Sequence, residues 1–363
     1  MSRRPARPAQ GPYAPPAAVT ELTVISGDGS RLHAELHGPE DAPAVVLVHG
    51  WTCSTAFWAP VVRELAADHR IVLYDQRGHG RSPAAGPGGY STHALADDLA
   101  AVLDQTLATG RRAVVVGHSM GGMTLMAAAD RPQLRERATA LLLCNTGASR
   151  LTERGRVVPL RGERLRTRVQ RALLCSRVPL GPVTPVYRRL LKYVTMGPAA
   201  GPTLVEACAR IVHACPRAVR GAWGRVMSDL DLDAEVGRLA LPTAVLAGTA
   251  DRLTPLDHAR ALAARLPRCA GLTELDGLGH MAPVEDPVAV SGVIRGLVAA
   301  YGQQDTAQDV GQGPAQDTTE GSQRDTGQGP AQDTGQGPAQ GRQQGAARTA
   351  RGATDDTVEE PTT

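Results

Sequence analysis

The residues with the clearest chemical meaning are a serine between two glycines, in Gly117-His118-Ser119-Met120-Gly121. The run before it, AVVVGHS (113–119), predicts a buried strand, and the small residues after it, MGGMTLMAAAD, predict a helix. In that context G-x-S-x-G is typical of a sharp turn that presents the serine hydroxyl for nucleophilic attack. The glycines are needed because the strained backbone leaves no room for side chains beside it. Ser119 is therefore the candidate nucleophile.

A serine hydroxyl attacks efficiently only when a base takes its proton, and a histidine held by a carboxylate supplies that base. His280 lies in GLGHMAPVEDP and Asp251 in AGTADRLTP, each just beyond a predicted strand. The chain order Ser119, Asp251, His280 is the order that accompanies this kind of serine turn. We therefore expect Asp251 to be the acid.

The elements that must position these residues follow a regular alternation between residues 19 and 302. Continuous apolar runs separated by helical segments predict a mostly parallel sheet covered on both faces, in which ligands bind at the carboxyl ends of the strands. The predicted fold class is therefore α/β, with a doubly wound sheet. The predicted elements are two strands within 20–38 joined by a Gly-Asp-Gly turn, strands at 44–50, 71–75, 113–119, 140–145, 243–248 and 272–277, and a helix at 90–107.

The distance from the strand at 140–145 to the strand at 243–248 is too long for one crossover. Residues 148–235 are expected to form an inserted helical cap, and 19–147 with 236–302 to form the core. The segments 1–18 and 303–363 are expected to be disordered, because the tail is a degenerate repeat of Gly, Gln, Asp, Thr, Pro and Ala that cannot bury enough apolar surface.

Composition excludes several classes of protein. The chain is 42% hydrophobic, and no stretch approaches the roughly 18 to 20 apolar residues of a spanning helix. The N-terminus shows no signal-peptide pattern, so a cytoplasmic location is expected. The six cysteines form no CxxC pair, which favours reduced, mostly buried thiols, and no metal site or cofactor is expected. A net charge of +3 does not indicate a nucleic-acid partner.

The charge is concentrated in the predicted cap. Residues 150–192 contain eleven Arg and one Lys against two Glu, a local balance of +10. Two interpretations stay open. The arginines are either a solvated helix face, or part of an amphipathic surface that contacts an anionic membrane or attracts an acidic substrate.

Together these motifs resemble the α/β-hydrolase superfamily over about residues 22–300. The resemblance rests on His49-Gly50-Trp51, on the DQRGHGRS segment from Asp75 to Ser82, on GHSMGG and on the segments of the proposed acid and base. It implies an α/β-hydrolase fold and an oxyanion hole formed by the backbone N–H groups of Trp51 and Met120. Epoxide hydrolases and haloalkane dehalogenases of the superfamily use an aspartate nucleophile, and prolyl aminopeptidase relatives usually have GxSWG at the turn; this chain has neither. Some lipases place the acid after the preceding strand, where this chain has Asn145, whose amide cannot carry the charge that steadies an imidazolium, so Asp251 is preferred.

The remaining polar and aromatic residues near these motifs have simpler expected roles. Trp51, Phe57 and Trp58 are candidates to line an acyl pocket. Asp75 and Arg77 are expected to pair with each other and brace a loop, and Asp97 and Asp98 to lie on the exposed face of the helix at 90–107. His49 and His118 are expected to hydrogen-bond neighbouring loops.

These expectations converge on a serine hydrolase that cleaves carboxylic esters of small-molecule or lipid-like substrates through an acyl-enzyme. The same triad also serves thioesterases, carbon–carbon bond hydrolases and perhydrolases, and the fold also occurs in ligand receptors without turnover, so these alternatives stay open. The sequence indicates neither the substrate nor the oligomeric state.

Overall fold

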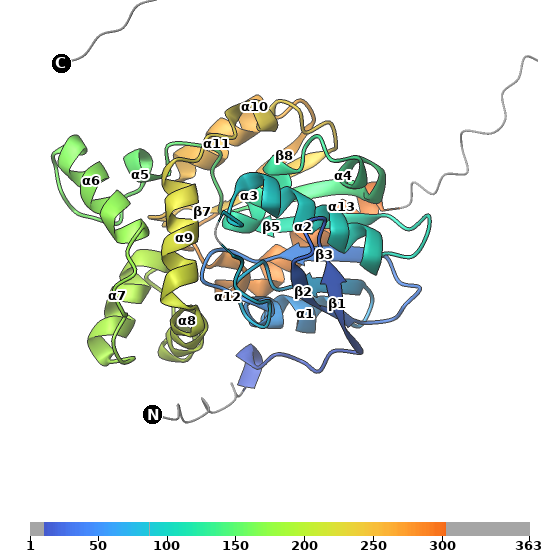
Figure 1. Cartoon of the computed structure of the whole chain (residues 1–363), viewed down its shortest axis with the longest axis horizontal. Helices are drawn as coiled ribbons and strands as arrows, with labels where there is room; N and C mark the ends of the chain where they lie inside the picture. Colours follow the sequence, from blue (N-terminus) through green and yellow to red (C-terminus); the bar gives the residue numbers. More distant parts are fainter. Residues whose placement is uncertain (1–10, 87, 303–363) are drawn as a thin grey trace, which may run out of the picture. The chain divides into compact units, whose positions relative to one another are not determined.

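The computed structural model describes residues 11–86 and 88–302 and contains one sheet of eight strands (Figure 1). The strand order is β1-β2-β4-β3-β5-β6-β7-β8, antiparallel between β1 and β2 and between β2 and β4, and parallel between all other neighbours. The predicted α/β class with a mostly parallel sheet is confirmed. The strands are β1 (Thr20–Ile25), β2 (Arg31–His37), β3 (Ala44–Val48), β4 (Arg70–Tyr74), β5 (Ala113–His118), β6 (Ala138–Cys144), β7 (Thr243–Gly248) and β8 (Cys269–Leu275).

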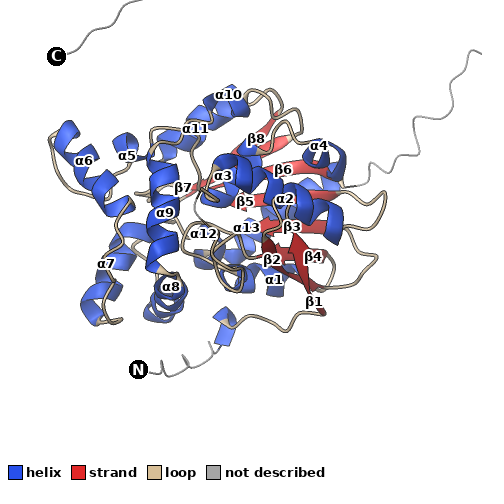
Figure 2. Ribbon diagram, in the orientation of Figure 1, coloured by secondary structure: helices blue, strands red, loops and turns tan. Residues whose placement is uncertain are grey.

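Helices cover both faces of the sheet, as the red strands between blue helices in Figure 2 show. Along β3, Val46 and Val48 pack in one apolar cluster with α2 and α3, while Val45 and Leu47 pack in the other with α1 and α13. Both sides of a strand are buried in this way, which explains its continuous apolar sequence. These helices are α1 (Ala59–Leu65), α2 (Thr92–Thr106), α3 (Met120–Ala127), α4 (Pro132–Arg137), α11 (Leu256–Arg265), α12 (Ala282–Glu285) and α13 (Pro287–Tyr301), with short 3-10 turns at Gly11–Tyr13 and Thr55–Trp58.

A helical insertion separates β6 from β7. It contains α5 (Leu151–Arg154), α6 (Glu163–Leu174), α7 (Pro185–Thr195), α8 (Pro202–Ala214), α9 (Arg217–Ser228) and α10 (Asp233–Val236). The predicted cap boundary at residue 235 falls inside α10, and the division into core and cap stays a prediction. None of the helices in the described ranges is both long and apolar enough to cross a membrane.

Strand boundaries and termini differ in detail from the predictions. The strand predicted at 272–277 is β8, Cys269–Leu275, which ends earlier because Gly277 turns the chain with φ 71°. In the segment expected to be disordered up to residue 18, a 3-10 turn spans Gly11–Tyr13, and the carbonyl of Ala14 accepts a hydrogen bond from Arg63 at 2.8 Å. Residues 1–10 and the predicted tail, 303–363, lie outside the described residues.

A buried ion pair joins α2 to the loop after β4. The Arg77 guanidinium donates to both oxygens of Asp98 at 2.7 and 2.6 Å, and each side chain is only 1% exposed. The expectation that Asp98 lies on an exposed helix face is therefore wrong, because the carboxylate is drawn inward to the guanidinium. Its neighbour Asp97 is 48% exposed and pairs with Arg131.

These adjacent aspartates give a matched stability test. Asp98→Ala leaves the buried guanidinium of Arg77 without its buried partner, and we expect the free energy of unfolding to fall by about 3–5 kcal/mol. Asp97→Ala removes a surface pair and is expected to lower it by less than about 1 kcal/mol. Urea titrations of both variants measure the difference, and equal losses would contradict the assigned role of the buried pair.

Three buried histidines, His49, His79 and His118, lie at or just beyond the carboxyl ends of the neighbouring strands β3, β4 and β5. Burial lowers the pKa of His49 to about 4 and the pKa values of His79 and His118 to about 3. The folded protein therefore holds these rings neutral at pH values where an unfolded histidine, with a pKa of about 6.5, is protonated. Between these pH values the unfolded chain binds more protons than the folded chain.

Stability is consequently expected to fall as the pH drops below about 6.5, with each such histidine contributing up to about 1.4 kcal/mol per pH unit. This contribution is fully present above the unfolded pKa. Urea titrations between pH 7.5 and about 4.5, which cover the upper part of the window between the unfolded and folded pKa values, measure the slope. His118→Asn should make the slope shallower, and the same substitution at exposed His93 should leave it unchanged. An unaltered slope in the first variant would refute the assignment.

Candidate active site

Ser119 occupies a strained turn between β5 and α3. Its backbone has φ 53° and ψ −117°, a conformation that costs a non-glycine residue about 1–3 kcal/mol. A Cβ on Gly117 would come within 2.4 Å of the Gly121 carbonyl oxygen, and one on Gly121 within 2.2 Å of the Val48 carbonyl oxygen. Ser119 N–H donates to the carbonyl of Cys144 at 2.9 Å, which ties the turn to the neighbouring strand β6.

His280 and Asp251 meet at the ends of β8 and β7. His280 Nδ1 lies 2.8 Å from Asp251 Oδ2, and both side chains are almost completely buried. Burial opposes ionisation of Asp251, but the pairing with His280 and hydrogen bonds from neighbouring groups outweigh it and lower the pKa of this carboxyl. The structure thus brings together the two residues that the sequence analysis paired.

Two further residues that sequence reasoning did not assign hold Asp251 in place. Asn145 Nδ2 donates to Asp251 Oδ2 at 3.0 Å and to the carbonyl of Gly279 at 3.1 Å. Thr254 donates its hydroxyl to Asp251 Oδ2 at 2.8 Å and its backbone N–H to Oδ1 at 3.0 Å. The sequence analysis excludes Asn145 as the acid, and the structure shows it as a hydrogen-bond donor to Asp251.

Features of the sequence could have identified both Asn145 and Thr254. Asn145 is the only asparagine in the 363 residues. Because the chain has no other asparagine, its occurrence at a strand end indicates a specific hydrogen-bonding role for this amide. Thr254 follows Asp251 by three residues, the spacing at which an aspartate accepts a hydrogen bond from the backbone N–H of a tight turn.

The loop containing Gly50 and Trp51 lies directly against the serine turn. A Cβ on Gly50 would come within 3.0 Å of Ser119 Cβ and 2.8 Å of His118 Nδ1. Within the described part of the chain, the backbone N–H groups of Trp51 and Met120 donate to no carbonyl oxygen. The assignment of these two N–H groups to an oxyanion hole remains an inference from the family resemblance.

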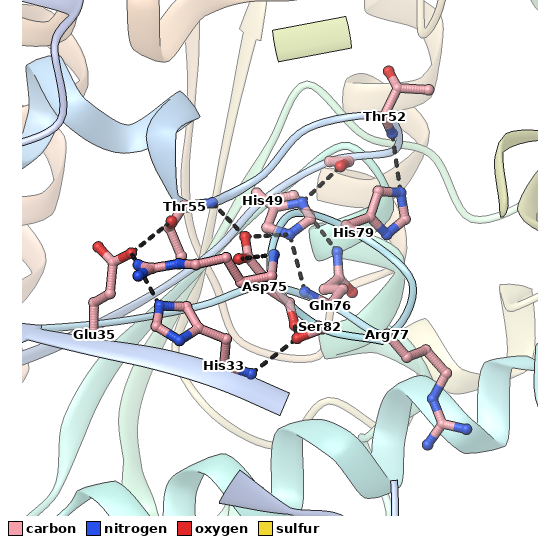
Figure 3. Close-up of polar contacts among 12 residues, drawn as sticks. His33, Glu35, His49, Thr52, Thr55, Asp75, Gln76, Arg77, His79 and Ser82 are labelled. Atoms are coloured by element: carbon pink, nitrogen blue, oxygen red, sulfur yellow. Dashed lines mark hydrogen bonds and ion pairs between the residues drawn. The ribbon is translucent and has the colours of Figure 1, made fainter. Parts of the chain in front are cut away.

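A network of buried polar side chains holds the loop that contains Gly50 and Trp51 in place (Figure 3). His49 Nε2 accepts a hydrogen bond from Gln76 N–H at 3.0 Å, and His49 Nδ1 donates to the Gly50 carbonyl at 2.8 Å. His79 Nε2 accepts from Thr52 N–H at 3.2 Å. These rings work as neutral acceptors, in agreement with their lowered pKa values.

Asp75 contributes to the same network but does not pair with Arg77. Its two oxygens accept from the backbone N–H groups of Thr55 and Arg81, each at 2.8 Å. Burial raises the pKa of Asp75, while these two hydrogen bonds oppose the rise. Arg77 turns away to Asp98, as Figure 3 indicates by its separate direction. The predicted Asp75–Arg77 pair is therefore wrong, although both residues do brace loops.

His118 connects the serine turn to the His280 loop, as expected for a residue that hydrogen-bonds a neighbouring loop. Its Nε2 donates to the carbonyl of His280 at 2.8 Å. His280 N–H in turn donates to the carbonyl of Thr195, the last residue of α7, at 2.9 Å. A Cβ on Gly279 would come within 2.3 Å of the Met196 backbone. The His280 loop is therefore held between the core and the helical insertion.

Ser119 and His280 both line a cavity of about 570 Å³ between the core and the insertion. Trp51 also lines it, and its indole N–H donates to the carbonyl of Arg220 at 3.1 Å. Most of the lining is apolar and comes from the insertion, with Leu151, Val157, Leu173, Leu174, Val178, Leu180, Leu190, Leu191, Val194, Val212 and Met227 as its apolar members there.

Phe57 and Trp58 do not line this cavity. Both are fully buried in the core, and the Phe57 ring stacks on His118 at a centroid distance of 4.5 Å. Both were candidates to line an acyl pocket, and neither is among the residues that line this cavity. The 3-10 turn Thr55–Trp58 instead directs them beneath the active-site floor.

One group of potential metal ligands occurs in the described ranges, away from these residues in sequence. Ligand atoms of Glu21, His33 and Glu35 lie within 4.8 Å of one another. Glu35 already accepts hydrogen bonds from His33 and from Thr55, which accounts for its burial without an ion. All six cysteines are free, and Cys53, Cys144, Cys208 and Cys215 are buried, as expected.

Comparisons with known proteins agree with this geometry. Residues 45–293 match the model of the "Alpha/beta hydrolase family". The "Putative carbamate hydrolase RutD" of Variovorax paradoxus (strain S110) is 34% identical over 234 residues, which cover 64% of this chain and 83% of that protein. RutD of Stutzerimonas stutzeri (strain A1501) is 31% identical over 262 residues, covering 70% of this chain and 92% of the relative.

Solved structures share the fold. An esterase from Rhodococcus sp. ECU1013 superimposes with a TM-score of 0.64 and 23% identity, covering 77% of this chain and 99% of that one. A hydrolase from Pseudomonas aeruginosa gives a TM-score of 0.62 and 25% identity, covering 78% and 99%. With the family match spanning most of the described residues and the fold shared, the chain belongs to the alpha/beta hydrolase family.

Proposed function

We propose that this hydrolase cleaves carboxylic esters through Ser119, His280 and Asp251. The observation that carries the proposal is that Ser119 and His280 line one cavity while His280 Nδ1 lies 2.8 Å from the buried carboxylate of Asp251. A hydrogen bond from Nδ1–H to the carboxylate leaves Nε2 as the free basic nitrogen. The ring can then accept a proton from a hydroxyl in the cavity.

The reaction follows from these positions. Ser119 Oγ attacks the ester carbonyl and gives its proton to His280 Nε2, and Asp251 stabilises the resulting imidazolium. The backbone N–H groups of Trp51 and Met120 stabilise the oxyanion, and His280 returns the proton to the departing alcohol. Water then attacks the acyl-enzyme with His280 as base, which releases the acid and restores the serine.

The cavity supports esters with an apolar acyl or alcohol group. At about 570 Å³ it is large enough for a drug-sized ligand, and its lining from the insertion is mainly aliphatic. Carbamates are the second candidate, because the relatives at 31–34% identity carry the name carbamate hydrolase. A small polar carbamate would leave most of this apolar volume unused, so we place esters first.

The nucleophile and base are tested by substitution. We expect a fluorophosphonate probe to label the native protein but not Ser119→Ala, and both Ser119→Ala and His280→Ala to lower kcat by about 10³-fold or more. Exposed His93→Ala is the control and should keep full activity. Equal labelling of the native protein and the Ser119 variant would disprove the nucleophile.

The same assay distinguishes the substrate classes. With nitrophenyl esters of increasing chain length, kcat/KM should rise with each methylene by up to about fourfold, since a buried CH₂ contributes about 0.8 kcal/mol. A nitrophenyl carbamate turned over faster than every ester would move the assignment to carbamates. Labelling of Ser119 without hydrolysis of any of these compounds would favour thioesters, carbon–carbon bonds, perhydrolysis or a receptor role.

Asn145 and Thr254 are expected to act by positioning Asp251. Loss of a hydrogen bond to a charged group costs about 1.5–3 kcal/mol, so Asn145→Ala and Thr254→Val should each lower kcat by about 10- to 150-fold with little change in KM. Thr106→Val, which removes a hydroxyl that donates only to the Val102 carbonyl within α2, should have no such effect. A rise in KM alone would instead indicate contact with the substrate.

A further inference from the structure

Exposed apolar side chains are concentrated on one part of the helical insertion. Of the eleven large apolar side chains that are exposed in the described residues, eight lie between Leu160 and Tyr193. On α7, Val186, Leu190 and Tyr193 are 75%, 60% and 39% exposed. Their spacing of four and three residues places them on one face of the helix. We call the surface formed by α6, α7 and the loop between them the α6–α7 face.

This face is continuous with the catalytic cavity. Leu173, Val178 and Leu190 are each more than half exposed and also line the cavity that contains Ser119. The same side chains therefore border both solvent and the cavity.

The face also carries positive charge. Arg164, Arg168 and Arg189 are exposed, and no carboxylate of the described residues lies within 4.0 Å of any of them. Two other arginines of these helices are paired, Arg171 with Asp229 and Arg188 with Glu206. The unpaired guanidinium groups are therefore available to an anionic partner beside the apolar residues.

Figure 1 shows α6 and α7 at the outer side of the insertion, with α8 and α9 between them and the sheet. Consistent with this, α6 packs on α9 and α7 on α8. The inner faces of these helices are used for packing, as buried Gln170 and Leu191 illustrate. The apolar residues of the outer faces have no such partner among the described elements, which is unusual for a surface in water.

We propose that the α6–α7 face docks on an anionic lipid surface and that apolar esters enter the cavity from it. An anionic lipid surface attracts basic side chains through its headgroups, and it buries the apolar side chains that insert beside them. The docking itself is independent of turnover; only the entry of esters rests on the proposed function. Because α7 ends at Thr195, whose carbonyl holds the His280 loop, the docking helix leads directly to the catalytic base.

Flotation with lipid vesicles tests the docking, using the full chain with Ser119→Ala so that hydrolysis plays no part. We expect this protein to float with phosphatidylcholine vesicles that contain phosphatidylglycerol, to float far less with phosphatidylcholine alone, and to be released by salt. Leu165→Ser with Val186→Ser removes two exposed side chains that do not line the cavity and should weaken binding by about tenfold or more. Arg164→Gln with Arg168→Gln should do the same for anionic vesicles.

The matched control is Val19→Ser with Val288→Ser, two exposed valines outside the insertion, at 68% and 64% exposure. It should float like the parent protein. Absence of flotation at low salt, or equal losses in the control, would overturn the proposal. So would size-exclusion chromatography in which the parent is a dimer and the Leu165/Val186 variant a monomer, because a second copy would then cover the face. If the native protein hydrolyses soluble esters but does not float, the ester proposal stands and the docking fails.

Discussion

The strained backbone of Ser119 is the constraint on which the rest of the site depends. A non-glycine residue stays at φ 53° only if its surroundings hold it there, and here the neighbouring strand and helix do so. The Ser119 N–H is bound by β6, the Ser119 carbonyl accepts from the Thr146 hydroxyl at 2.7 Å, and Gly121 packs on the end of β3. The central strands must therefore end at one level, which the parallel register of the sheet ensures.

A second constraint is the buried charge of Asp251. A carboxylate removed from water is costly unless hydrogen bonds replace its hydration. Here His280, Asn145, Thr254 and the backbone N–H of Leu253 all bind it, and they come from the ends of β6, β7 and β8. Asp251 in turn bonds the imidazole of His280, so the contacts that stabilise the buried charge also fix the orientation of that ring.

Hydrogen bonds to backbone carbonyls join the helical insertion to the core. The donors are the indole N–H groups of two tryptophans and the backbone N–H groups of loops. Trp51 of the core donates to Arg220 of α9, and Trp223 of α9 donates to the carbonyl of Arg77, both at 3.1 Å. These contacts hold α9 against the core, while α6 and α7 present apolar side chains outward. The cavity is thus formed by residues of the insertion together with core residues that lie before and after it in the sequence.

Much of this arrangement was predictable from local signals. The strained serine turn, the order of the catalytic candidates and the class of sheet depend on glycines and apolar runs that act over a few residues. Other features depend on contacts between residues far apart in sequence. Asn145 reaches Asp251 across 106 positions, Phe57 and Trp58 point into the core, and Arg77 selects Asp98 over nearby Asp75. The type of a residue limits the partners that it can have. The tertiary structure decides which of them it binds, because the packing of sheet and helices determines which side chains come within hydrogen-bond distance.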